Sequence, residues 1–196
     1  MLLNLQVQWE MNMTEYAIAT DPTCVPETAC VIVPFHGKKL EVFGLATWLS
    51  PYARYFVKLG MQLEHNTQNN NELANTEPIL VKAQREWKTT IDVIFINDDL
   101  IQPPDDVVYQ ALRFAKQKGY TNVSMQLIRS GKEPYPQAEN QKKNALAMLS
   151  VCELFPKMHI TIVLNTLEQY AWLELQNKHV SFLGFWHEEV KKFLPN

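Results

Sequence analysis

Cysteine is scarce in this sequence. Its three cysteines, Cys24, Cys30 and Cys152, form no C-x-x-C pair, and an odd number of dispersed cysteines argues against a disulfide scaffold and against a structural zinc site. The five histidines show neither H-x-x-x-H nor H-E-x-x-H spacing, so metal catalysis has no support. We therefore expect neither a bound metal nor a cofactor.

Long apolar runs and an excess of positive charge are also missing. No stretch approaches the roughly 18 apolar residues of a membrane span, and residues 1–13 contain no lysine or arginine and no sustained apolar run, unlike a secretory signal. The formal net charge of −3 gives no general attraction for nucleic acid or an anionic membrane. These absences predict a cytoplasmic protein with neither membranes nor nucleic acid as partners.

The composition suits one globular domain. The 196 residues are 46% hydrophobic and 20% charged, enough for one sizeable core. We expect an N-terminal tail over residues 1–13, the domain over 14–180, and a C-terminal segment over 181–196 that packs its aromatic side chains on the domain. A partner surface is the alternative for that last segment.

Short apolar strands alternate with amphipathic helices. The sequence predicts strands at 16–20, 29–34, 79–83, 91–97, 122–128 and 159–164, and helices at 45–59, 103–118, 137–154 and 167–176. This order predicts an α/β fold of three layers, α/β/α, with a mixed sheet that is mostly parallel. The short connector after residue 83 predicts one antiparallel pair, between 79–83 and 91–97.

Each of the two central helices has an apolar face. For helix 103–118 the predicted inward residues are Val107, Val108, Ala111, Leu112 and Ala115, and for helix 137–154 they are Ala145, Leu146, Leu149 and Cys152. Proline and two aspartates suit the start of the first helix, and Gly119 is expected to stop it.

Ligands of mainly parallel sheets bind outside the carboxyl ends of the strands. The segments that follow the predicted ends are Asp21-Pro22, Phe35-His36-Gly37, Asn97-Asp98, Arg129 to Pro136, and Asn165-Thr166. We expect any binding site to be built from these segments.

The segment Arg129 to Pro136 lies between a buried strand and a helix. Its residues Ser130, Gly131 and Lys132, together with backbone N–H groups at the helix start, suit a cradle for an anion. The segment has neither the Walker A pattern nor the G-x-G-x-x-G pattern. A solvated connecting loop is the alternative, which the spacing alone favours.

Two other segments hold ligand candidates. The carboxylate of Asp21 could accept a hydrogen bond from an exocyclic amine such as that of adenine, or simply cap a turn. Phe35, His36 and Gly37 follow the most apolar strand and could face a ligand, but Phe35 could equally be core and His36 surface. No second cue indicates a Ser-His-Asp or Cys-His assembly, so nucleophilic catalysis of that kind has no support.

In order, these elements resemble the macro domain family from about Tyr16 to Leu175. Ala19-Thr-Asp-Pro-Thr23 is similar to the family's glycine-aspartate-isoleucine-threonine turn, and Ala29 to His36 is similar to its strand that ends in an asparagine-alanine-alanine-asparagine motif. Arg129 to Pro136 is similar to its serine-threonine-glycine-valine-tyrosine-glycine loop. The final strand and helix, His159 to Leu175, look like the unit that closes the family's fold.

The resemblance implies a protein that binds ADP-ribose or ADP-ribosylated protein. It implies that Asp21, next to Pro22, holds the adenine amine, and that Asn165 lies near the adenine. It also implies that the backbone from Ser130 to Glu133 surrounds the diphosphate and the distal ribose.

One branch of the family removes ADP-ribose from acidic side chains, and Gly119 to Met125 is similar to it. That branch uses a strand lysine and an acid in the late loop, which the resemblance would place at Lys82 and Glu133. The lysine amine could attack the anomeric carbon while the carboxylate shuttles protons. The alternative is that both are solvent-exposed charges.

The chain also departs from the family pattern. Pro34, Phe35 and His36 stand where many family hydrolases have asparagines, and Lys38 and Lys39 replace glycines in the first phosphate loop. These departures support another hypothesis, a macro-fold protein-interaction module with a degraded nucleotide pocket. Binding of RNA or poly(ADP-ribose) is a third hypothesis, which the net charge of −3 does not favour.

Overall fold

The computed structural model describes part of the chain. The described residues are 14–18, 23, 25–35, 54–55, 58–59, 77–87, 89–98, 101–126, 128, 138–164 and 180–182. They form strands β1 (Thr14–Ile18), β2 (Cys30–Phe35), β3 (Ile79–Val81), β4 (Asp92–Asn97), β5 (Asn122–Gln126), β6 (His159–Leu164) and β7 (Val180–Phe182), helices α2 (Pro104–Gln117) and α3 (Ala138–Cys152), and the 3-10 helix η2 (Arg85–Trp87).

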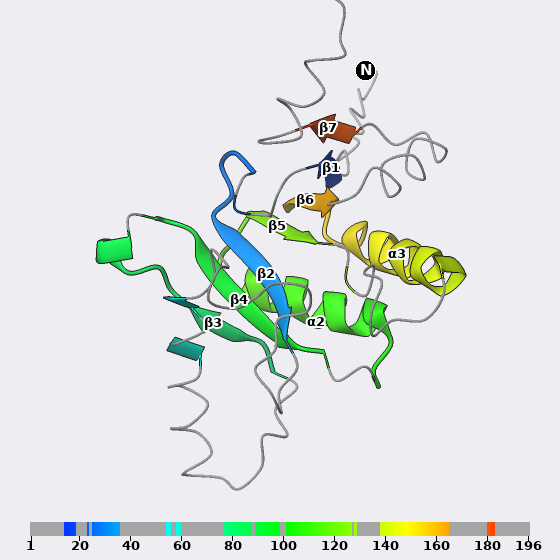
Figure 1. The fold of residues 1–196 in the computed structure, drawn as a ribbon, viewed down its shortest axis with the longest axis horizontal. Coiled ribbons are helices and arrows are strands. Elements are labelled where there is room, and N and C mark those ends of the chain that lie inside the picture. Colours follow the sequence, from blue (N-terminus) through cyan, green and yellow to red (C-terminus); the bar gives the residue numbers. More distant parts are fainter. Residues whose placement is uncertain are drawn as a thin grey trace, which may run out of the picture.

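The strands make one sheet in the order β3-β4-β2-β5-β6-β1-β7. All neighbours pair in parallel except β3 and β4, which are antiparallel. The predicted mixed, mostly parallel sheet and its antiparallel pair are therefore confirmed. The edge strand β7, which pairs with β1, was not predicted (Figure 1).

Alternate residues of β2 and β4 supply two cores, one on each face of the sheet. Ile94 and Ile96 of β4 belong to the core that α2 and α3 cover, and these helices lie side by side in Figure 1. Val93 and Phe95 of β4 belong to the opposite core. There they pack with Tyr55 and Leu59, which are helical. Helical residues on both faces confirm the predicted three layers.

The local sequence explains α2 well. Pro104 opens it, and Asp105 and Asp106 lie in its first turn, where carboxylates stabilise the positive end of the helix dipole. All five residues of its predicted apolar stripe are buried. Gly119 follows the helix with a φ of +84°, the left-handed conformation that glycine adopts at little cost. The predicted helix and its stop are confirmed.

The predicted inner face of α3 is partly wrong. Leu149 and Cys152 are buried as expected, but the side chain of Leu146 is 51% exposed, and Met148 is buried instead. Two residues represent about 200° of rotation on a helix, so burial of Met148 turns Leu146 toward solvent. Ala145, whose side chain was also predicted to point inward, is not among the described side chains.

Two other predicted helices are described in part or not at all. Of residues 45–59, residues 54, 55, 58 and 59 are described, and all four are helical. The predicted helix at 167–176 lies outside the described residues. Within the described part of the chain, neither α-helix combines the length and apolar character of a membrane span.

Candidate functional site

The carboxyl ends of five parallel strands meet at one edge of the sheet. Because β1, β6, β5, β2 and β4 run parallel side by side, the chain leaves each of them on the same side. We call this side the carboxyl edge, and the last strand residues there are Ile18, Leu164, Gln126, Phe35 and Asn97. It is the edge at which parallel sheets bind ligands.

Most of the predicted ligand residues follow the carboxyl edge directly in sequence. They lie outside the described residues, and they are Asp21, Pro22, His36, Gly37, Ser130, Gly131, Lys132, Glu133 and Asn165. The strands that precede them are described, so the structure fixes where these segments begin.

Phe35 is the predicted ligand residue that the structure describes at this edge. Its side chain is only 3% exposed, and its ring packs edge to face against Phe95, with 6.2 Å between ring centroids. The ring therefore belongs to the core. At the carboxyl edge, Phe35 therefore contributes its backbone and not its ring. The carbonyl of Phe35 accepts a hydrogen bond from the N–H of Asp98 at 2.8 Å.

Asp98 is a feature of this edge that the sequence analysis did not select as a ligand candidate. It follows β4 directly, and it is completely buried. The sequence does carry a signal for it, because this acid follows a strand whose middle residues, Val93 to Ile96, are all apolar. Its position after the strand is what places Asn97-Asp98 among the predicted edge segments.

The chain leaving β5 is anchored to α3. The backbone N–H of Ile128 donates to the Sδ atom of Met148 at 3.4 Å, and both residues are buried. A thioether is a weak acceptor, but it satisfies a buried N–H that follows the end of the strand. The predicted anion-binding segment, which begins at Arg129, therefore starts from a fixed point in the core.

Lys82, the predicted nucleophile, lies at the other end of the sheet. It is exposed and follows β3, whose Val81 pairs with Val93 near the start of β4. The backbone N–H of the next residue, Ala83, donates to Oδ1 of Asp92 at 2.7 Å. From Asp92 to Asn97, β4 spans about 17 Å at the usual rise per residue. The structure does not bring Lys82 together with the carboxyl edge.

Asp92 is the centre of a polar network at this amino end. Its Oδ2 atom accepts a hydrogen bond from the hydroxyl of Tyr120. Burial raises the pKa of Tyr120, and the hydrogen bond to Asp92 raises it further. The hydroxyl of Tyr55, whose pKa is also raised by burial, donates to the carbonyl of Ile91. Both phenols therefore stay protonated and act as hydrogen-bond donors.

The two described thiols are buried and unreactive in character. Burial, with a smaller effect of Asp92, raises the pKa of Cys30 to about 12. Burial also raises the pKa of Cys152 to about 12. Since the thiolate is the nucleophilic form, neither Cys30 nor Cys152 is suited to covalent catalysis near neutral pH.

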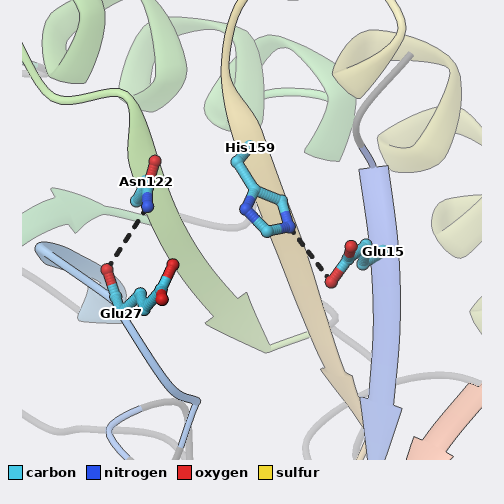
Figure 2. A network of polar contacts seen from close by, with 4 residues as sticks. All are labelled: Glu15, Glu27, Asn122 and His159. Carbon is cyan, nitrogen blue, oxygen red and sulfur yellow. Dashed lines mark hydrogen bonds and ion pairs between the residues drawn. The ribbon is translucent and has the colours of Figure 1, made fainter. Parts of the chain in front are cut away.

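Two further contacts join neighbouring segments at the amino end (Figure 2). Nε2 of His159 lies 3.0 Å from Oε2 of Glu15, an ion pair when the imidazole is protonated, although this buried nitrogen makes no hydrogen bond of regular geometry. The side-chain amide of Asn122 donates to the carbonyl of Glu27 at 3.5 Å. Among the described side chains, no group of three or more His, Cys, Asp or Glu is arranged to hold a metal ion.

Comparison with known proteins finds similarity in structure alone. No protein-family model matches the sequence, and no curated protein sequence matches it. Several solved structures do match, among them three macrodomains.

One is a variant of the Oceanobacillus iheyensis macrodomain with ADP-ribose, at a TM-score of 0.60 and 17% identity over 81% of this chain and 88% of that one. Another is the macrodomain of Thermus aquaticus DarG, with a TM-score of 0.55 and 7% identity over 79% of this chain and 99% of that one. The macro domain of ganglioside-induced differentiation-associated protein 2 matches with a TM-score of 0.54 and 14% identity, over 85% of this chain and 83% of that one. The chain therefore has the macrodomain fold, carried by a sequence far from those of these similar structures.

Proposed function

We propose that this protein binds ADP-ribose, free or attached to a protein, at the carboxyl edge of its sheet. The observation that carries the proposal is the meeting of five parallel strand ends at that edge, directly before the segments that the sequence marks as ligand-binding. Two similar structures support the ligand class, since the Oceanobacillus iheyensis macrodomain is described with ADP-ribose and with ADP.

The proposed roles follow the order of the strands. In the segment that follows β1, Asp21, next to Pro22, accepts a hydrogen bond from the adenine amine. In the segment that follows β6, Asn165 lies near the adenine. The two strands are neighbours in the sheet, so one base could be reached from both.

The phosphates would be held after β2 and β5, which are also neighbours. Backbone N–H groups and the charge of Lys132 supply the recognition in the segment with Ser130 and Gly131. His36 and Gly37 face the same ligand after β2. Phe35 contributes through its backbone, because its ring is buried in the core.

Hydrolysis of the ADP-ribosyl linkage is a finer proposal that rests on the resemblance of Lys82 and Glu133 to the residues of one macro domain branch. The separation of about 17 Å between Lys82 and the carboxyl edge favours binding over hydrolysis that depends on Lys82. A Lys82→Ala variant that hydrolyses ADP-ribosylated glutamate at the wild-type rate would remove Lys82 from the chemistry.

Isothermal titration calorimetry with ADP-ribose tests the binding proposal. We expect micromolar binding by the wild type, loss of binding in Asp21→Ala, and unchanged binding in the control Glu153→Ala, which alters an exposed acid beyond α3. No heat of binding from a folded wild type at millimolar ligand would refute the proposal. That outcome would favour the interaction module, in which the fold persists without a working pocket.

A further inference from the structure

Asp98 differs from every other described residue of the core. The buried polar or charged residues among those described are Asp98, Ser124 and Thr161. Ser124 and Thr161 are neutral hydroxyl residues within strands β5 and β6, whereas Asp98 is an acid. Removing a carboxylate from water carries a large free-energy cost unless the fold supplies partners. Asp98 makes a further interaction in the folded chain besides its backbone bond to Phe35.

The register of β4 places Asp98 on a defined face. Phe35 pairs with Asn97 as the last residues of the two strands, and the N–H of Asp98 then donates to the Phe35 carbonyl at 2.8 Å. This bond continues the ladder one residue beyond β4, so strand alternation still holds there. Asp98 therefore falls on the face of Ile94 and Ile96, which α2 and α3 cover.

Asp98 also connects two segments that leave the carboxyl edge. Its N–H holds the carbonyl of Phe35, the last described residue before the predicted ligand residues His36 and Gly37. Its side chain is completely buried at the point where the chain leaves β4 toward α2. Because the buried side chain and the bonded N–H belong to one residue, we expect a change of the side chain to loosen the bond that fixes the end of β2 as well.

We propose that Asp98 is a positioning residue that sets the direction in which the chain leaves β2 and β4, and thereby sets the affinity of the carboxyl edge for an ADP-ribose-type ligand. The inference rests on the proposed binding function. Asp98 is completely buried and acts on the ligand through the backbone that it holds, without contact of its own.

The test combines hydrogen exchange with calorimetry on the full chain. Asp98→Ala is expected to speed amide exchange about tenfold or more in peptides that contain the ends of β2 and β4, but not in peptides from β6. It is also expected to weaken ADP-ribose binding about tenfold or more. Asp98→Asn keeps the size and one acceptor oxygen, so both effects should be smaller, and it serves as the second variant if Asp98→Ala does not fold.

Ser124→Ala is the matched control, because it also removes a fully buried polar group, but from within β5. Ser124→Ala should leave ADP-ribose affinity within about twofold of the wild type, even if it loses as much stability as Asp98→Ala. Equal exchange in Asp98→Ala and Ser124→Ala at the ends of β2 and β4 would overturn the positioning role. Faster exchange with unchanged affinity would overturn its link to the ligand. A wild type that binds no ADP-ribose would refute the proposed function, while the exchange result would still decide whether Asp98 fixes the strand ends.

Discussion

Tyr120 donates a hydrogen bond from its phenol to Oδ2 of Asp92, and this bond crosses the amino end of β2. Tyr120 lies just before β5 and Asp92 begins β4, while β2 lies between those two strands in the sheet. The other oxygen of Asp92 accepts from the N–H of Ala83, beyond β3. One carboxylate thus ties together three segments of the amino end.

Asp92→Ala should lower the free energy of unfolding by about 2–3 kcal/mol, because it leaves two part-buried donors without an acceptor. Tyr120→Phe removes only one of these bonds and should cost about 1 kcal/mol. Urea unfolding measures both values. Lys82→Ala is the control, since Lys82 is exposed beside the same network. An equal loss in Asp92→Ala and Lys82→Ala would show that the network adds no stability.

Gly119→Ala should destabilise the protein by about 1–2 kcal/mol. Gly119 has a φ of +84°, and a Cβ built there meets no atom within 4 Å, so the cost is conformational rather than steric. Gly119→Asn should cost less, because asparagine tolerates left-handed backbone better than alanine. Thermal unfolding ranks the three proteins, and an alanine variant as stable as the wild type would contradict the argument.

Stability should fall as the pH rises above about 9. The pKa of Cys30 is raised from 9.0 to about 12, and that of Cys152 is raised equally. Between these values the unfolded chain releases the thiol protons while the folded chain keeps them, so the folded state is the one that loses stability as pH rises. Each thiol contributes a slope of up to about 1.4 kcal/mol per pH unit.

Urea unfolding at pH 8, 9, 10 and 10.5, to be run on the wild type and Cys152→Ala, measures this slope. The variant removes one of the two buried thiols, so its stability should decline less steeply. The same burial predicts that Cys30 and Cys152 resist alkylation in the folded protein and react after unfolding, which peptide mass spectrometry can follow. Parallel decline of the two proteins would argue against the role of Cys152.

Glu15→Gln should change the free energy of unfolding by less than about 1 kcal/mol, despite the 3.0 Å contact with His159. The side chain of Glu15 is 65% exposed, so water screens the pair. The pairing of β1 with β6 depends instead on the backbone ladder. A loss well above this value in chemical unfolding at pH 6 would show that the ion pair holds the two strands together.

Much of the fold could be predicted because its signals are local. The stripe from Val107 to Ala115 has helical spacing, and Gly119 marks the stop, so α2 was predicted closely. The inner face of α3 was harder, because its apolar residues are nearly continuous from Ala145 to Val151 and their spacing does not select one face. β7 was missed because three residues, Val180–Phe182, carry little alternation, and what makes them a strand is the distant partner β1.

The site was less predictable than the fold. The sequence places residues after strand ends, but only the sheet order shows which ends are neighbours. The antiparallel direction of β3 sends Lys82 toward the amino end, although its strand is part of the same sheet. The burial of the Phe35 ring and of Asp98 depends on packing against distant residues, which spacing along the chain does not report.

The order of the strands in the sheet also determines when each strand can pair during synthesis of the chain. Strands β2 to β5 come from a continuous stretch, from Cys30 to Gln126, and can pair with one another once that stretch is made. β1 is made first, yet its ladder partners are β6 and β7, near the other end of the sequence. Contacts between such distant residues form late because the loop between them must first close. At the ribosome, therefore, Thr14–Ile18 must wait as an unpaired strand until His159–Leu164 has emerged.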